Sequence, residues 1–456
     1  MLFAVMLTPV AVWGLVWCLR EPMRIALPIF AALVPYGSGL SLGSSRFGSL
    51  SSLAGLVLGA GLALQLVTGR KGATHPSYTV PVWILFVGTA LLTVLWSIDR
   101  SASISSLLVL VSLVVVYVLT TISRADRDIL RRAENALLVG GVSVVMYGIA
   151  ELTFLGGLPT KSAGGAADAG QGRFGDNLLG ANIEAVALLY PLVVALTRFM
   201  DPGRKRRWWY LAAAVLMLVG VFMTGSRGGL LATGISLVTM TFAGPHRIRR
   251  PMLAVIGLGV VLATYVYVLH PFGIAERTYA SPTSSSGRTD IWQVGLASCP
   301  QYCTFGAGWG TFPDVYAATQ AQVPSAAVLV GTGASYQPHN VWLLAIVEAG
   351  LPGVLLLSLG LLISAAEGLA LPVRLRAPPL AALFGLMFAV VLLSSLEFKC
   401  FWMVLMMVSI SRNVAIAEKA PRELVAVHSG GRRPRHRSRS ATGRRKVARA
   451  AASRDS

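Results

Sequence analysis

Residues 338–357, PHNVWLLAIVEAGLPGVLLL, begin an apolar run that is long enough to cross a lipid bilayer. His339 and Asn340 stand at the start of this run, and Glu348 lies inside it. Ionisable side chains are costly within a membrane and usually face a cavity or a partner. The stretch therefore predicts a membrane helix whose polar groups face a cavity or a partner.

Similar apolar runs recur along most of the chain, which has 456 residues, of which 55% are hydrophobic and 13% are charged. Soluble domains carry about 25% charged residues. We therefore expect an all-α polytopic membrane protein, a helix bundle of about 12 to 13 spans with two long outer loops. The expected spans lie near residues 2–19, 25–42, 50–68, 79–97, 104–122, 135–155, 181–199, 208–224, 227–243, 252–270, 340–364, 380–396 and 400–416.

Cationic residues gather in alternate short connections between these spans, and the positive-inside rule places such connections in the cytoplasm. We therefore expect the long loops 156–180 and 271–338 outside, and the C-terminus inside. Residues 1–418 would form the transmembrane domain, and residues 419–456 a disordered basic tail against anionic lipids. These loops and the tail account for the net charge of +20, so no nucleic-acid partner is expected.

The cysteines do not suggest a metal site. Cys299 and Cys303 share one outer loop that offers no further ligands, and a disulfide between them is left open. Cys18 and Cys400 fall in apolar spans as small hydrophobic residues. The sequence has no Gly-rich phosphate loop or Walker motif, so we expect no cofactor and no nucleotide chemistry in the cytoplasm.

The expected topology brings several polar residues to the outer face. Each of these residues also has a purely structural explanation. An arginine could extend to the lipid headgroups, a loop charge could be solvated, and the histidine could make a structural hydrogen bond. Glu184 and Glu348 are harder to explain in this way, because they lie within spans. The outer-face residues are Arg173, Asp176, Glu184, Arg227, Arg288, Asp290, His339 and Asn340.

Helical spacing suggests that His339, Gly350 and Gly353 share one face, where glycines would let a neighbouring helix or a lipid chain come close. Arginine suits a diphosphate because its planar fork bonds two oxygens and keeps its charge. A histidine near these arginines is the best candidate acid–base group at neutral pH.

These stretches resemble the O-antigen ligase and polymerase family over roughly residues 170–400. His339-Asn340, followed by GLPG at 350–353, fits the ligase signature of His-Asn and spaced glycines. The other matching blocks are GRFGDNLLGANIEA at 172–185, SRGG at 226–229, GRTDIW at 287–292 and FGAGWGTF at 305–312.

The resemblance implies a GT-C-type membrane glycosyltransferase that needs no metal. Such enzymes take a glycan from undecaprenyl diphosphate outside the cytoplasmic membrane and pass it to a hydroxyl of a glycolipid, a polysaccharide or a protein. His339 would be the base, and Arg227 and Arg288 would hold the diphosphate, with Arg173 nearby. Attack opposite the diphosphate would invert the anomeric centre.

The remaining candidate residues would support the substrate. Asn340 would position His339, and Asp290 or Glu348 would orient an arginine. Glu184 would face a partner or a cavity, and Gly350 and Gly353 would accommodate the carrier chain.

Two alternatives stay open at this point. A polysaccharide polymerase of the same family would use the same donor and similar motifs, although the His-Asn-Gly spacing favours a ligase. A transporter for lipid-linked glycans or anions is the alternative from another class. It is disfavoured because the halves show no repeat and the polar groups cluster at one face.

Overall fold

The computed structural model of the chain describes residues 12–37, 39–41, 48–69, 76–154, 174–175, 178–269, 288–323, 336–393 and 396–429. Two compact units divide the chain, residues 1–416 and residues 417–456, and every contact reported below lies within the first. The assignment of residues 1–418 as the transferase domain and of the tail as disordered stays a prediction.

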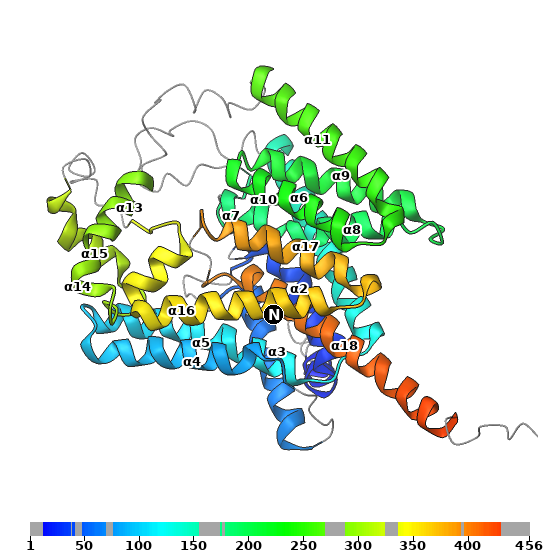
Figure 1. The fold of residues 1–456 in the computed structure, drawn as a ribbon, viewed down its shortest axis with the longest axis horizontal. Coiled ribbons are helices and arrows are strands. Elements are labelled where there is room, and N and C mark those ends of the chain that lie inside the picture. The colour runs from blue at the N-terminus through cyan, green and yellow to red at the C-terminus, as the bar shows by residue number, and fades with distance from the viewer. Residues whose placement is uncertain are drawn as a thin grey trace, which may run out of the picture. The chain divides into compact units, whose positions relative to one another are not determined.

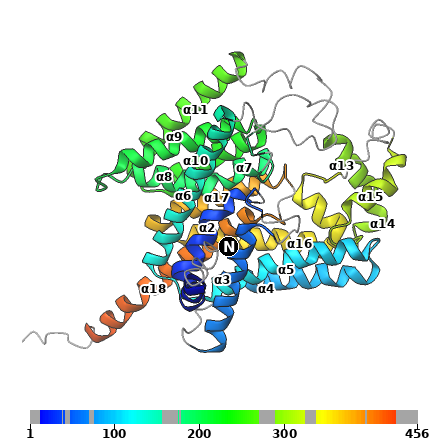
Figure 2. The ribbon, with the colours of Figure 1, turned by 180° about the vertical axis from the view of Figure 1, so that it is seen from behind.

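Helices make up nearly all of the regular structure in the described residues, and the remaining regular feature there is an isolated β-bridge between Ser41 and Ser49 (Figures 1 and 2). The α-helices are α2 (Leu27–Leu33), α3 (Leu50–Val67), α4 (Thr79–Leu92), α5 (Arg100–Ile122), α6 (Arg127–Phe154), α7 (Ala181–Ala187), α8 (Leu189–Phe199), α9 (Arg207–Met223), α10 (Arg227–Ala243), α11 (Arg249–Leu269), α13 (Arg288–Ala297), α14 (Cys299–Tyr302), α15 (Phe312–Thr319), α16 (Val341–Ala370), α17 (Val373–Ala389) and α18 (Lys399–Ser429).

Seven helical segments within the described residues are long and apolar enough to cross a membrane, which confirms the all-α polytopic membrane fold. The expected total of about 12 to 13 spans stays a prediction, because α10 and α17 are shorter than these and most of the first expected span lies outside the described residues. The seven segments are Leu50–Val67, Thr79–Trp96, Arg100–Ile122, Arg127–Glu151, Ala181–Phe199, Val341–Ala370 and Lys399–Lys419.

Polar side chains fix where several of these helices begin. The Ser49 hydroxyl accepts a hydrogen bond from the Ser52 N–H at 3.2 Å, and Asp99 accepts one from the Ala102 N–H at 3.0 Å. Ser226 caps α10 in the same way, at 3.0 Å from the Gly229 N–H. Such caps satisfy N–H groups that have no partner inside the helix, so they define the first turn closely.

Helix α16 is central to the arrangement, since it packs against both α4 and α17 (Figures 1 and 2). Its contact with α4 is close because Gly360 has no side chain, and a Cβ there would lie 2.8 Å from the Trp83 ring. Trp83 in turn packs against Trp402 of α18, with ring centroids 4.9 Å apart. These aromatic contacts tie α4, α16 and α18 into one core.

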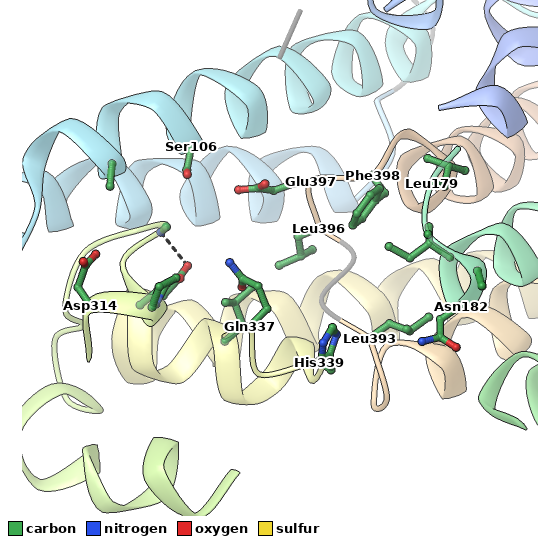
Figure 3. A pocket seen from close by; sticks show the side chains of 18 of the residues that line it. Ser106, Leu179, Asn182, Asp314, Gln337, His339, Leu393, Leu396, Glu397 and Phe398 are labelled. Carbon is green, nitrogen blue, oxygen red and sulfur yellow. Dashed lines mark hydrogen bonds between the residues drawn. The ribbon is translucent and has the colours of Figure 1, made fainter. Parts of the chain in front are cut away.

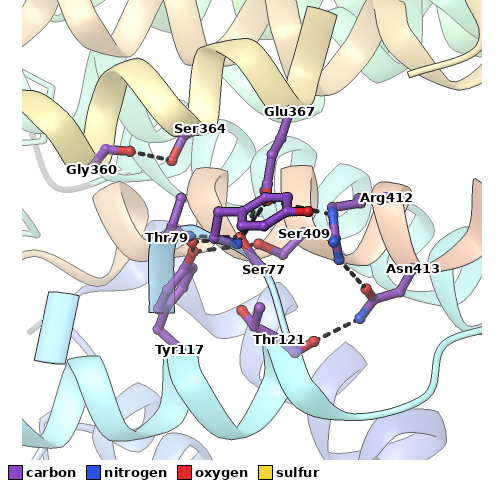
Figure 4. Close-up of polar contacts among 11 residues, drawn as sticks. Ser77, Thr79, Tyr117, Thr121, Gly360, Ser364, Glu367, Ser409, Arg412 and Asn413 are labelled. Carbon is purple, nitrogen blue, oxygen red and sulfur yellow. Dashed lines mark hydrogen bonds and ion pairs between the residues drawn. The ribbon is translucent and has the colours of Figure 1, made fainter. Parts of the chain in front are cut away.

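A buried polar network fixes the C-terminal part of α16 (Figure 4). The Glu367 carboxylate accepts hydrogen bonds from the Ser77 hydroxyl at 2.8 Å and lies 3.4 Å from the Arg412 guanidinium. Asn413 of α18 donates to the Thr121 carbonyl of α5 at 2.7 Å. A buried charge pair is stable only when its other hydrogen bonds are made, as they are here. The network therefore holds α5, α16 and α18 in register below the site described next.

Candidate functional site

His339 lies in the turn before α16 with an unusual backbone. Among the residues that the structure describes, it is the one non-glycine residue with a left-handed conformation, at φ 47°. The turn is held from both sides. The Trp292 indole N–H donates to the Pro338 carbonyl at 2.6 Å, and the Val341 N–H donates to the Val390 carbonyl at 2.9 Å. Strained backbone of this kind persists where the surroundings enforce it, often at functional sites.

Asn340 is the N-cap of α16. Its side-chain oxygen accepts hydrogen bonds from the N–H groups of Trp342 and Leu343, each at 3.0 Å. The amide oxygen is therefore occupied by the helix, and Asn340 fixes the point at which α16 begins. This contact sets the chain direction at His339, its neighbour. Any direct substrate contact by Asn340 stays a prediction.

The two candidate arginines each stand at the first position of a helix. Arg227 begins α10 and Arg288 begins α13. Desolvation lowers the pKa of Arg288, and the nearby charge of Arg227 lowers it further. Desolvation likewise lowers the pKa of His339, and the charge of Arg288 adds to this effect. Arg288 is therefore within electrostatic reach of both Arg227 and His339.

This arrangement calls for an anion. Within the described part of the chain, neither Arg227 nor Arg288 forms an ion pair with a carboxylate. Two like charges held together repel each other, and an anion between them would relieve that repulsion. Both arginines also stand at helix N-termini, where free N–H groups and the helix dipole favour negative charge.

His339 also lines a cavity of about 610 Å³ (Figure 3). One wall is apolar and is formed by Leu179, Leu393 and Phe398, whereas Ser106 and Gln337 lie on the polar side. His339 is accessible from this cavity, and the two arginines are not among the cavity's lining residues. The imidazole thus lies at the cavity and within electrostatic reach of Arg288.

The cavity contains residues that sequence analysis missed. Asp99 and Ser106 come from the start of α5, where the sequence suggested only a generic apolar span. Asp314 lies in the first turn of α15, and Glu397 precedes α18. The available signal was the polar character of residues 97–106, SIDRSASISS, at the mouth of an apolar run.

Helix α16 is broken inside its membrane-spanning length. Gly350 has φ 71° and ψ −170°, which interrupts the helical hydrogen bonds. The Ala307 N–H donates to the freed Val347 carbonyl at 2.8 Å, and the Gly308 N–H donates to the Glu348 carbonyl at 3.1 Å. The motifs FGAGWG and GLPG therefore form one junction, in which the loop satisfies the backbone groups that the break exposes.

The expectation that His339, Gly350 and Gly353 share a helix face is wrong. The helix starts after His339 and breaks at Gly350. A Cβ on Gly350 would lie 2.5 Å from the Thr304 carbonyl oxygen, so this glycine lets the loop pack against the break. A Cβ on Gly353 would lie 2.4 Å from the Ala349 Cβ. Both glycines thus serve close packing, and their expected contact with the carrier chain stays a prediction.

The expectation that Asp290 or Glu348 orients an arginine is not met in the described residues. Glu348 is buried, and its carboxylate accepts hydrogen bonds from the N–H groups of Gly310 at 2.8 Å and Phe312 at 3.0 Å. The pKa of Tyr316 is raised by desolvation, by the neighbouring Tyr336 and by the charge of Asp290. Asp290 therefore lies near the Tyr316 ring. Glu348 therefore anchors the 305–312 loop, although one side of it reaches the cavity.

Glu184 is fully buried in α7, and neither carboxylate oxygen has a hydrogen-bond partner among the residues that the structure describes. Its side chain packs against Gly175, where an added Cβ would lie 2.6 Å from the Glu184 Cβ. The preceding residues Asn182 and Ile183 line the cavity, but Glu184 does not. Arg173 and Asp176, the other candidates from this stretch, lie outside the described residues.

The cysteine question that the sequence left open has an answer. Cys299 and Cys303 form a disulfide that closes the short helix α14, whereas Cys18 and Cys400 are free. Within the described residues, no cluster of three or more His, Cys, Asp or Glu side chains is suited to hold a metal ion.

Comparison with known proteins identifies the part of the chain that carries this arrangement. Residues 212–358 match the family model described as O-antigen ligase. A search of curated proteins finds no match to the chain. The matched region runs from α9 into α16 and contains Arg227, Arg288, His339 and the glycines at the break. The match over residues 212–358 and the membrane fold confirm the resemblance to the O-antigen ligase family that was seen in the sequence.

Proposed function

We propose that this protein transfers a glycan from an undecaprenyl diphosphate carrier to an acceptor hydroxyl. The observation that carries the proposal is that Arg288 lies within electrostatic reach of both Arg227 and His339, while neither arginine has a carboxylate partner in the described residues. A diphosphate between the two guanidinium groups would match both their charge and their planar hydrogen-bonding geometry.

The chemistry assigns one task to each group. The acceptor oxygen attacks the anomeric carbon while the bond from that carbon to the diphosphate oxygen breaks. His339 takes the acceptor proton, and its lowered pKa keeps it neutral and able to do so at neutral pH. The diphosphate leaves as an anion that Arg227 and Arg288 stabilise, so the leaving group needs no proton. Attack from the opposite side inverts the anomeric centre.

The reaction would take place on the outer side of the cytoplasmic membrane. Positive residues alternate between the short connections, which supports a cytoplasmic location for those loops and for the basic tail. The Cys299–Cys303 disulfide supports the opposite, oxidising side for the segment that also carries Arg288. A ligase is preferred to a polymerase because the matching family model is described as a ligase.

Reconstitution tests this function directly. Purified protein in nanodiscs is supplied with an undecaprenyl-diphosphate glycan and acceptors of the three classes: glycolipid, polysaccharide and protein. We expect an acceptor whose mass rises by that of the donor glycan, with release of undecaprenyl diphosphate and no need for a nucleotide sugar. In proteoliposomes, movement of the intact donor across the bilayer without any transfer would instead indicate a transporter.

The pH dependence of transfer provides a second prediction. Because desolvation and Arg288 lower the pKa of His339, the base stays neutral below its ordinary pKa of about 6.5. The acid limb of kcat/KM should therefore lie below pH about 6.5. Arg288→Gln removes a positive neighbour, so the pKa of His339 should rise and the limb should move to higher pH.

The matched control is Arg132→Gln, which removes one positive charge from an exposed pair with Asp128. Its acid limb should coincide with that of the wild type. An acid limb that stays in place in Arg288→Gln, or moves equally in the control, would contradict the assignment of His339 as the titrating base.

A further inference from the structure

The cavity beside His339 has a charge opposite to that of the arginine pair. Its lining includes Asp99, Asp314, Glu348 and Glu397 and, among the residues that the structure describes, no lysine or arginine. These acids come from the start of α5, from α15, from α16 and from the segment before α18. Helices distant in sequence therefore bring acidic side chains to one partly open cavity, next to the proposed base.

Two of these carboxylates also serve the fold. Asp99 accepts a hydrogen bond from the Ala102 N–H at 3.0 Å, and Glu348 accepts two from backbone N–H groups. Asp314 and Glu397 are the other two acidic residues of the lining, and Glu397 is exposed. The side chains of Glu397, Gln337 and Ser106 face the same space in Figure 3.

The lining suits a sugar rather than a phosphate. Carboxylate and amide oxygens accept hydrogen bonds from hydroxyl and amino groups, and Gln337 and Asn182 also donate. The opposite wall, with Leu393 and Phe398, offers an apolar surface for the C–H face of a ring. A cavity of about 610 Å³ lies within the usual size range of small-molecule sites.

The negative lining also excludes a class of ligand. Carboxylates in a space with limited solvent repel a second anion more strongly than they would in bulk water. A diphosphate is therefore directed to the arginine pair and away from this cavity. The same repulsion acts on any sugar that carries a carboxylate of its own.

We propose that this cavity binds the acceptor sugar and selects neutral or amino-bearing sugars over uronic acids, with Asp314 and Glu397 as the specificity-determining residues. The assignment of the bound sugar as acceptor rests on the proposed function, because His339 must reach the hydroxyl that attacks. The selectivity itself rests on the charge and shape of the cavity.

Binding of matched sugars tests the charge selectivity of the cavity separately from its assignment as the acceptor site. The probes are the methyl glycosides of a hexose, the corresponding 2-amino hexose and the corresponding hexuronic acid, in gluco, galacto and manno series. Affinities for the protein in nanodiscs are measured by saturation-transfer NMR titration, and glycan transfer is measured on the same preparations. In the series that binds, the uronide should bind about tenfold more weakly than the neutral hexoside, and the amino sugar more tightly.

The double variant Asp314→Asn/Glu397→Gln keeps the shape of both side chains and removes two negative charges. The uronide and the neutral hexoside should then bind within about twofold of each other. The control Asp128→Asn removes an exposed carboxylate that pairs with Arg132, and it should keep the wild-type preference. Higher salt should narrow the preference of the wild type, since it screens charge.

Equal binding of neutral and uronic sugars by the wild type, or an unchanged preference in the double variant, would overturn the inference. Absence of binding by every probe would overturn it as well. Transfer that proceeds under those conditions would leave the proposed function intact. If the neutral hexoside binds more tightly than the uronide but no glycan transfer is detected, the sugar site is supported and the proposed function is contradicted.

Discussion

Replacement of His339 by alanine should lower the rate of glycan transfer by about 10²- to 10⁴-fold, the usual contribution of a general base. The imidazole lines the cavity within electrostatic reach of Arg288, and it is the proposed acceptor of the proton from the attacking hydroxyl. Transfer is measured with purified protein, and undecaprenyl-linked glycan should accumulate in cells that carry the variant at normal abundance.

The backbone of His339 requires a second variant. At φ 47°, alanine is strained, so His339→Ala would change both the base and the turn. Asparagine tolerates the left-handed region better than most residues and lacks an imidazole. His339→Asn should therefore keep the fold and lose transfer to a similar extent. Near-normal transfer by His339→Asn would show that this position serves the turn before α16 and not the chemistry.

Replacement of both Arg227 and Arg288 by lysine should reduce transfer by about 10²-fold or more, although the total charge is unchanged. A lysine ammonium is a point charge and cannot form the two parallel hydrogen bonds of a guanidinium. Affinity for undecaprenyl diphosphate should fall together with the transfer rate, as measured by competition against a labelled donor.

Arg207→Lys is the matched control for this pair. Arg207 also begins a helix, α9, and its guanidinium lies over the Trp208 ring at 5.2 Å. It should retain wild-type transfer and donor affinity. Full activity in the doubly substituted protein would mean that the two arginines contribute only general positive charge.

The general fold could be predicted from the sequence because long apolar segments have few alternatives in a bilayer. The helices α3, α5 and α16 start within a few residues of the expected spans. The break at Gly350 was not predicted, because it depends on the loop residues 304–308, which supply N–H groups and a carbonyl from 40 or so positions away in the chain.

The candidate site was predicted where a short motif carries the chemistry. His339, Arg227 and Arg288 each stand beside a recognisable block, and the structure brings Arg288 within electrostatic reach of the other two. The acidic wall of the cavity could not be found in this way. Asp99, Asp314 and Glu397 are ordinary polar residues at helix starts, and only tertiary packing places them around one space.

The most direct test of the central claim measures donor affinity and transfer on the same preparations of wild type, His339→Asn and Arg227→Lys/Arg288→Lys. The claim is that one pair of arginines holds the diphosphate while a separate imidazole takes the proton. We predict that His339→Asn binds undecaprenyl diphosphate with nearly wild-type affinity and transfers poorly, whereas the arginine variant loses both. Equal loss of donor affinity in His339→Asn, or undiminished affinity in the arginine variant, would contradict this division of roles.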